Sequence, residues 1–245
     1  MKYTADFETT TDKEKPVSVW AWAICNVNSP DIWYRGTDIA EFFETVKSLD
    51  NPTLYFHNLK FDDSYILYWL LKNGYEWKES NRVATSKSFT TIISGDGKFY
   101  GTTIYFNVNG KKKQKCTIYD SLKLLNMPVE AVANTFKLPI KKGKIDYDRH
   151  NEECEVTFDE WEYLYCDVKI MALALKQLFD KGFSKMTIGG CALSDYKEFF
   201  GRKHFEKIFP ELPIETDSKI RMSYRGGFTF ANPYWINKAI EKGIV

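Results

Sequence analysis

KYTADFETT, residues 2–10, is a short run of strand-forming residues that carries two carboxylates one residue apart. Side chains of an extended chain alternate between two faces, so Asp6 and Glu8 point to one face while Phe7 points to the opposite layer. Two neighbouring carboxylates repel each other, and an oxygen-only pair suits a hard divalent cation such as Mg²⁺ or Mn²⁺. A solvated strand end with chance acids explains this stretch equally well, so acids elsewhere in the chain must decide between the two.

The composition is typical of a globular protein that is made and used inside a cell. The 245 residues, 44% of them hydrophobic, are enough for one large or two modest domains. The five cysteines are scattered without a CxxC pair, which indicates neither a disulfide scaffold nor a zinc site. No apolar run is as long as a membrane span, and the N-terminus lacks a signal-peptide pattern. We therefore expect a cytoplasmic protein with no membrane partner.

The charges are nearly balanced overall but unevenly placed. The formal net charge is +1, yet lysines form two groups, Lys111, Lys112, Lys113 and Lys115, and Lys137, Lys141, Lys142 and Lys144. Aromatic residues make up 16% of the chain, and exposed rings beside lysines would form a stacking surface for a single strand. Lysines also gather on ordinary exposed turns, so structure alone is an alternative explanation of the first group.

The pattern of apolar residues predicts a meander followed by alternating strands and helices on a mixed sheet. Capping boxes begin helices at Asp38 and Thr157, and Asn109-Gly110 is a strong hairpin signal. The expected strands are residues 2–10, 17–26, 31–35, 54–57, 89–94, 98–108 and 114–119, and the expected helices are residues 38–49, 62–73, 128–136 and 157–181. This is an α/β domain that ends near residue 182, and glycines and prolines divide residues 183–245 into short helices and turns.

Two further acids complete a candidate metal site. Tyr163 and Asp167 lie four residues apart, on one face of the long helix. Asp62 opens the helix that follows a buried strand, where the helix dipole favours a carboxylate. Each is ordinary by itself, as a helix cap or a surface acid. Together, Asp6, Glu8, Asp62 and Asp167 favour a metal-dependent site.

These residues resemble the motifs of a known family. Asp6-x-Glu8, Asn58-x-x-Phe61-Asp62 and Tyr163-x-x-x-Asp167 are similar to the three exonuclease motifs of the DEDD superfamily, in its tyrosine-containing branch. The runs YFHNLKFD (55–62), YDSLK (119–123), Lys142 to Tyr147 and YRGG (224–227) further resemble the exonuclease half of protein-primed family B DNA polymerases of small phages. The resemblance covers nearly the whole chain. It implies an α/β, ribonuclease H-like exonuclease domain over residues 1–182 and a connector over 183–245 that would lead into a polymerase palm.

The resemblance also implies a role for each acid. Asp6 would bridge two divalent cations, Mg²⁺ or Mn²⁺, Glu8 and Asp167 would complete the site of the water-activating ion, and Asp62 would hold the other ion. Tyr163 would orient the attacking water, and Lys142 would stabilise charge on the scissile phosphate. A solvated lysine is the alternative for Lys142, and Asp63 is an alternative to its neighbour Asp62.

The family positions that contact a single-stranded 3′ end match residues spread over four segments. They are Thr9, Tyr55, Asn58, Phe61, Ser121, Leu122 and Tyr147. Ordinary core packing is the alternative for Tyr55, Phe61 and Leu122. In the family, the turn that matches Tyr224, Arg225, Gly226 and Gly227 links exonuclease and polymerase and grips the primer strand.

The expected function is a proofreading-type 3′→5′ exonuclease that releases nucleoside 5′-monophosphates from single-stranded DNA ends. A non-catalytic module that binds single-stranded DNA, a terminal protein or a polymerase domain is the alternative from another class. RNA trimming is a second enzymatic alternative. The sequence shows no polymerase carboxylates, fingers or thumb, so a truncated phage polymerase and a free-standing nuclease both remain open, with the host cytoplasm as the expected location.

Overall fold

The structure is a computed structural model that describes residues 1–12, 14, 16–95, 97–151 and 154–223. The chain divides into two compact units, Met1–Leu193 and Ser194–Val245. Within the described ranges, no helix is both long enough and apolar enough to cross a membrane.

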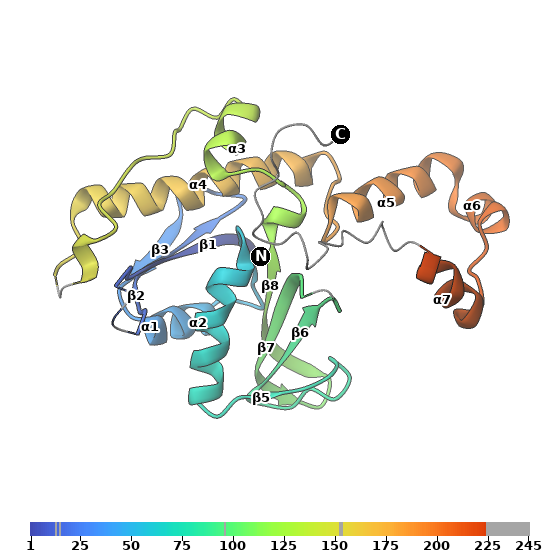
Figure 1. Ribbon diagram of the computed structural model, residues 1–245, viewed down its shortest axis with the longest axis horizontal. Helices are drawn as coiled ribbons and strands as arrows, with labels where there is room; N and C mark the ends of the chain where they lie inside the picture. Colours follow the sequence, from blue (N-terminus) through green and yellow to red (C-terminus); the bar gives the residue numbers. More distant parts are fainter. Residues whose placement is uncertain (13, 15, 96, 152–153, 224–245) are drawn as a thin grey trace, which may run out of the picture. The chain divides into compact units, whose positions relative to one another are not determined.

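The first unit is built on one mixed sheet, to which the described residues contribute eight strands (Figure 1). The strands are β1 (Lys2–Thr9), β2 (Val19–Asn26), β3 (Trp33–Gly36), β4 (Thr53–Phe56), β5 (Glu76–Trp77), β6 (Ser88–Ile93), β7 (Phe99–Asn109) and β8 (Lys112–Asp120). Their order across the sheet is β3-β2-β1-β4-β8-β7-β6-β5. The central strands β1, β4 and β8 run parallel, while β1–β2, β2–β3, β6–β7 and β7–β8 pair antiparallel. The expected mixed sheet is confirmed.

Helices cover both faces of this sheet. They are α1 (Ile39–Ser48), α2 (Leu59–Lys72), α3 (Val129–Thr135) and α4 (Phe158–Asp180); the unit also holds the short 3₁₀ turns η1 (Ser121–Lys123) and η2 (Arg149–Asn151) and the beginning of α5 (Ile188–Phe200). Figure 1 shows α3 and α4 on one side of β1–β3, and α1 and α2 on the other. The capping box expected at Thr157 forms with Glu160 at the start of α4, whereas at Asp38 the structure shows a simple cap, in which the side chain accepts from the Ala40 amide.

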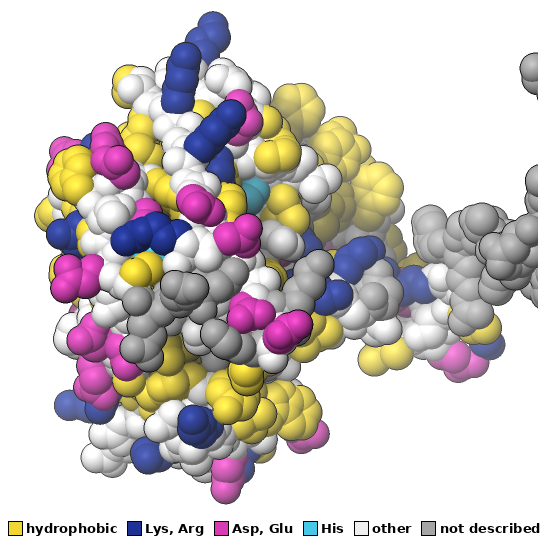
Figure 2. All heavy atoms as spheres, turned by 60° about the vertical axis from the view of Figure 1, so that its left-hand side comes forward, with side chains coloured by type: hydrophobic (Ala, Val, Ile, Leu, Met, Phe, Trp, Pro, Cys, Tyr) yellow, Lys and Arg dark blue, Asp and Glu magenta, His cyan; other side chains and the backbone are white. Residues whose placement is uncertain are grey.

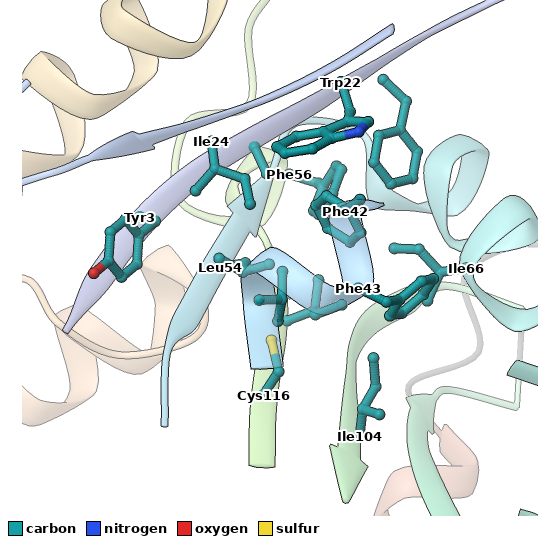
Figure 3. Packing of buried hydrophobic residues seen from close by; sticks show 14 of the residues in the cluster. Tyr3, Trp22, Ile24, Phe42, Phe43, Leu54, Phe56, Ile66, Ile104 and Cys116 are labelled. Carbon is teal, nitrogen blue, oxygen red and sulfur yellow. The ribbon is translucent and has the colours of Figure 1, made fainter. Parts of the chain in front are cut away.

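The alternation along β1 divides the core into two layers. Phe7 packs edge-on against Phe42 of α1 and Phe56 of β4, with ring centroids 4.8 and 5.1 Å apart, in the layer drawn in Figure 3. The opposite face of β2 presents the small side chains Ala21, Ala23 and Cys25 to the layer formed with α3 and α4. Small residues let a helix lie close to a strand, and here they let α4 approach the face that carries Asp6 and Glu8.

Two elements differ from the sequence-based expectation. Helix α2 begins at Leu59 rather than at Asp62, so Asp62 lies in its first turn. The reason is Asn58, which serves as the N-cap with a left-handed φ of 69°, a conformation that asparagine tolerates better than most residues. Strand β5 was not expected, because two residues are too few to show a periodic pattern.

The second unit contains the end of α5 together with α6 (Arg202–Ile208) and α7 (Ile214–Ser223). Tyr196 packs against Phe200 and Phe205, with ring centroids 4.7 and 5.8 Å apart. The expected short helices are therefore present in the described part of this unit.

Candidate metal and nucleic-acid site

The candidate site lies where the central parallel strands end. Tyr55 of β4 is paired with Thr4 of β1 and Tyr119 of β8, so β4 and β8 end at the same level, and β1 runs on past them to Thr9 with Asp6 and Glu8 beyond their ends. In open α/β sheets, ligands bind in the crevice outside the carboxyl ends of the strands. The segments that follow β4 and β8 here are the first turn of α2 and the 3₁₀ turn η1.

Three carboxylates meet at this edge. Asp6 and Glu8 come from β1 and Asp167 comes from α4, and each offers an oxygen within 4.8 Å of the oxygens of the other two. The Thr4 hydroxyl donates a 2.7 Å hydrogen bond to the Val168 carbonyl and so ties β1 directly to α4 beside Asp167. The sheet and the helix therefore bring together acids that are about 160 residues apart in sequence.

Asp62 faces this cluster and Asp63 does not. Asp62 is 3% exposed, and its Oδ1 has no hydrogen-bond partner among the described residues. The nearby charges of Asp6 and Glu8 contribute to raising its pKa, after the larger effect of burial. Both oxygens of Asp63 instead accept from the Thr102 hydroxyl of β7, at 3.0 and 2.9 Å. Asp62 is thus unpartnered and close enough to feel the charges of Asp6 and Glu8, whereas Asp63 has a partner elsewhere.

The electrostatics of the cluster fit a bound cation. Burial, and then the charge of Asp167, raise the pKa of Asp6 to about 7, and burial followed by Asp6 and Asp167 raises the pKa of Glu8 to about 9. Asp167 also has an Oδ1 without a hydrogen-bond partner among the described residues. Buried acceptors without donors, beside mutually repelling carboxylates, are costly until a cation supplies positive charge. Oxygen-only ligands of this kind suit Mg²⁺ or Mn²⁺.

Lys142 and Tyr163 border the cluster. Lys142 Nζ lies 2.6 Å from Asp167 Oδ2 and 5.2 Å from the centre of the Tyr163 ring. Burial lowers the pKa of Lys142, but the charge and hydrogen bond of Asp167 outweigh it and leave the pKa raised. A Cβ on Gly143 would lie 3.3 Å from Tyr163 Cδ2, so the glycine lets this loop pass close to the ring. The structure therefore places Lys142 at the acids and not in open solvent.

Tyr163 is linked in turn to a second tyrosine. Its hydroxyl shares a 2.8 Å hydrogen bond with the hydroxyl of Tyr147, whose ring is 46% exposed. Burial, and then the charge of Asp167, raise the pKa of Tyr163, so this phenol stays protonated and able to donate. A neutral donor is thus held at the edge of the carboxylate cluster.

The other residues expected to contact a strand divide into accessible and buried ones. Asn58 is exposed and Phe61 is 51% exposed, while Thr9 and Leu122 are partly exposed. Tyr55 is 5% exposed and packs against Tyr119 and Phe179, so its position matches the core-packing alternative. Tyr224, Arg225, Gly226 and Gly227 lie outside the described residues. The accessible members could therefore meet a strand, whereas Tyr55 belongs to the core.

Ser121 is buried and engaged by its neighbours. Its Oγ lies 2.9 Å from the Phe56 carbonyl and 3.0 Å from His57 Nδ1, and His57 Nε2 lies 2.9 Å from the Met127 carbonyl. Burial lowers the pKa of His57, so the ring is neutral and its single N–H belongs on Nε2, where only a carbonyl can accept it. The Ser121 hydroxyl donates to the Phe56 carbonyl, and its contact with His57 Nδ1 keeps it between the ends of β4 and β8.

Two residues at the site had no role in the sequence-based hypothesis. His57 lines a cavity of about 150 Å³ together with Asp6, Lys142 and Asp167. Asp120, buried at the end of β8, accepts hydrogen bonds from Asn58, Leu59 and Leu122. Both stand inside motifs used for the family resemblance, next to Asn58 and Ser121, and that adjacency is the signal that could have found them.

The lysines of the β7–β8 hairpin give no sign of a dedicated phosphate site. Lys111 and Lys112 are exposed, while Lys113 donates to the Asn81 carbonyl at 3.1 Å. On the face that Figure 2 shows, basic and acidic side chains are interspersed and do not form a patch of one sign. The solvated-turn explanation therefore accounts for what the structure shows of this group.

Comparison with known proteins places these observations in a family. The family model for DNA polymerase type B, organellar and viral, matches residues 45–162 and 153–245. The DNA polymerase of Bacillus phage Nf is 40% identical over 99% of this chain and 42% of its own length, and that of Bacillus phage phi29 is 38% identical over 99% and 42%. A solved structure of phi29 DNA polymerase complexed with single-stranded DNA matches with a TM-score of 0.82 and 38% identity, over 95% of this chain and 41% of that one.

This chain spans about two fifths of the length of the curated relatives it matches. The likeness to the solved structure, together with the mixed sheet and its helices, confirms the expected ribonuclease H-like fold.

Proposed function

Because the chain belongs to the organellar and viral type B DNA polymerases and corresponds to their N-terminal exonuclease region, we propose that it is a metal-dependent 3′→5′ exonuclease of the proofreading type. Its substrate is the 3′ end of single-stranded DNA, and its products are nucleoside 5′-monophosphates. The observation that carries this proposal is the meeting of Asp6, Glu8 and Asp167 within 4.8 Å of one another. Clustered acids repel phosphate, so a site that only bound a strand would gain nothing from them.

The four acids are the residues that would hold the cations. By the family resemblance, Asp6 would serve both ions, Glu8 and Asp167 would complete one site, and Asp62, whose Oδ1 has no hydrogen-bond partner among the described residues, would hold the second. Two divalent cations, when bound, would activate the attacking water and neutralise charge on the phosphate and the leaving 3′ oxygen. The orphaned oxygens of Asp62 and Asp167 support this assignment.

The remaining groups orient the substrate and the water. Tyr163 stays protonated and can donate a hydrogen bond at the edge of the cluster, which suits it to hold the attacking water in line. Lys142 adds a positive charge beside Asp167, where it would offset charge that develops on the phosphate. Phe61 and Tyr147 offer exposed rings on which the terminal bases can stack once they leave the duplex.

The proposal includes an organisation of the chain and its partners. Residues 1–182 would carry the exonuclease, and residues 183–245 would connect it to a polymerase palm, with a terminal protein or a polymerase domain as partner. A DNA substrate is supported by the phage DNA polymerases among the relatives, and the host cytoplasm is the location proposed with it.

The decisive experiment uses one oligodeoxynucleotide labelled at the 5′ end and another labelled at the 3′ end. Each is incubated with the purified chain and Mg²⁺, Mn²⁺ or a chelator, beside an oligoribonucleotide of the same sequence. Stepwise shortening from the 3′ end that requires metal and favours DNA is expected. Binding without any cleavage would favour the non-catalytic alternative, and equal trimming of RNA would remove the preference for DNA.

A further inference from the structure

Asp120 lies behind the candidate site, at the end of β8. It is 2% exposed and pairs across the sheet with Phe56, the last residue of β4. It does not belong to the carboxylate cluster, and its oxygens contact backbone amides and one lysine. A buried carboxylate with several donors normally holds those donors in place.

One oxygen of Asp120 connects two separate turns. Oδ1 accepts from the amides of Asn58 and Leu59, at 3.1 and 3.3 Å, and from the amide of Leu122, at 3.0 Å. The first two amides open helix α2, and the third belongs to η1. A single carboxylate therefore fixes the distance between the segment after β4 and the segment after β8.

This contact replaces a missing helix cap. Asn58 is the N-cap of α2, but it makes no side-chain capping bond and has a left-handed φ of 69°. The first amides of a helix need acceptors, and a carboxylate near them is favoured by the helix dipole. Asp120 supplies that acceptor from another strand, so the Asn58 side chain is left exposed and free to meet a ligand.

The second oxygen of Asp120 is held by Lys123. Lys123 Nζ lies 3.2 Å from Oδ2 and 5.6 Å from the centre of the Tyr100 ring. This pairing neutralises the buried charge and keeps Oδ1 turned toward the three amides. The carboxylate is thus oriented from both sides.

We propose that Asp120 is a positioning residue for the single-stranded 3′ end, because it sets the register between Asn58 and Phe61 on one turn and Ser121 and Leu122 on the other. The inference rests on the proposed function, since those four residues are the expected strand contacts. Loss of the carboxylate would let the two turns separate, and a strand that must touch both would bind more weakly. The cation ligands Asp6 and Glu8 on β1 and Asp167 on α4 would stay in place, because no bond of Asp120 reaches them, whereas Asp62 lies in the first turn of α2, whose amides Asp120 holds.

The test compares Asp120→Asn with a matched control, Thr102→Val. Asparagine keeps the shape of the Asp120 side chain but removes its negative charge. Its amide nitrogen would replace the oxygen that contacts the Lys123 ammonium, so that ion pair is lost. Thr102→Val removes the hydroxyl bonded to Asp63, another buried carboxylate of α2, and so perturbs the same helix and sheet without removing an acceptor from the amides of Asn58, Leu59 and Leu122. Binding of a 5′-fluorescein oligodeoxynucleotide is measured by anisotropy in chelator, and cleavage and Mn²⁺ binding are measured in parallel.

For Asp120→Asn we expect Kd and KM for the oligonucleotide to rise about tenfold, and kcat and Mn²⁺ affinity to change by less than about threefold, because Asp6, Glu8 and Asp167 keep their places. Thr102→Val should lower the melting temperature and leave Kd and KM as they were. Unchanged Kd in Asp120→Asn, or an equal rise in both variants, would overturn the inference. Should Asp120→Asn not fold, Lys123→Gln frees Oδ2, and a rise in Kd of about threefold is expected there. An unchanged Kd in Lys123→Gln would also overturn the inference.

The binding arm separates this inference from the nuclease proposal. If the unaltered chain binds the oligonucleotide but does not cleave it, the nuclease proposal fails and the Kd values alone decide the role of Asp120. If the unaltered chain does not bind, both fail together.

Discussion

Helix α4 carries two buried acids, Glu160 and Asp167, whose pKa values shift in opposite directions. They lie seven residues apart, on nearly the same side of the helix. Burial raises the pKa of Glu160, but hydrogen bonds from Thr157, Arg149 and His150 outweigh it and bring the pKa to about 2. Burial raises the pKa of Asp167 too, and there the opposing effect of Lys142 is too small to reverse it.

The difference is in what surrounds each carboxylate. Glu160 accepts from Arg149 at 2.8 and 2.6 Å, from the Thr157 amide at 2.8 Å and from the Thr157 hydroxyl at 2.9 Å. Asp167 meets one lysine and two other carboxylates, and one of its oxygens has no hydrogen-bond partner among the described residues. The Glu160 carboxylate already has hydrogen-bond donors for its oxygens and stabilises the fold. The Asp167 carboxylate lies beside two others, and one lysine does not balance their charge, so a cation can bind there.

The strongest test of this comparison is Asp6→Ala, with Asp167→Ala beside it. Either change removes a carboxylate from the cluster, so we expect 3′ cleavage to fall by about a thousandfold or more. The fold should be retained, because fewer clustered acids repel one another less. Cleavage rates check the loss of activity, and circular dichroism spectra check that the fold is retained. A variant that keeps most of its activity would remove that acid from the mechanism.

Glu160→Gln should act on stability and not on chemistry. The substitution replaces the carboxylate that accepts from Arg149 with a neutral amide. It should lower the free energy of unfolding by about 2 kcal/mol at pH 7. The folded pKa of about 2 lies below the ordinary value of 4.5, so the stabilisation is present above pH 4.5 and is lost as the pH falls toward 2.

Urea unfolding at several pH values measures the effect of Glu160→Gln. As the pH falls, the free energy of unfolding of the unaltered chain should approach that of the variant. If the difference between the two stays constant from pH 7 to pH 3, the ionised Glu160 is not its source.

Tyr163→Phe removes only a hydroxyl at the border of the cluster. We expect the cleavage rate to fall about tenfold, because the water loses the donor that orients it. Mn²⁺ binding, followed by calorimetry, should not change, since no carboxylate is altered. Tyr147→Phe is the matched control: it removes the partner of the same 2.8 Å hydrogen bond and should have the smaller effect on kcat. A rate equal to that of the unaltered chain would exclude Tyr163 from catalysis.

The smallest expected effect is stabilisation by the cation itself. At a Mn²⁺ concentration about five times its Kd, binding to the folded chain alone should add about 1 kcal/mol to the free energy of unfolding. Melting curves with and without Mn²⁺ measure the shift, which should vanish in Asp6→Ala and persist in Glu160→Gln. A shift of the same size in Asp6→Ala would place the cation elsewhere.

Much of the fold follows from local patterns in the sequence. The alternation of Asp6, Phe7 and Glu8, the caps at Asp38 and Thr157 and the hairpin at Asn109-Gly110 all depend on residues close together in the chain. The start of α2 was missed because its cap acceptor is Asp120, more than sixty residues away. Tyr55 likewise fits either a strand contact or a core position until its neighbours Tyr119 and Phe179 are known.

The sequence by itself determined which side chains of β1 share a face, where α1 and α4 begin, and that acids of the metal-binding type stand in a recognisable order. Only the tertiary structure decided that Asp62 and not Asp63 joins the cluster, that Glu160 is satisfied while Asp167 is not, and that Asp120 joins two turns. The physical reason is that a strand or a helix sets the direction of its own side chains over a few residues. The charge state and the partners of a buried acid depend on whatever distant segments the fold packs against it.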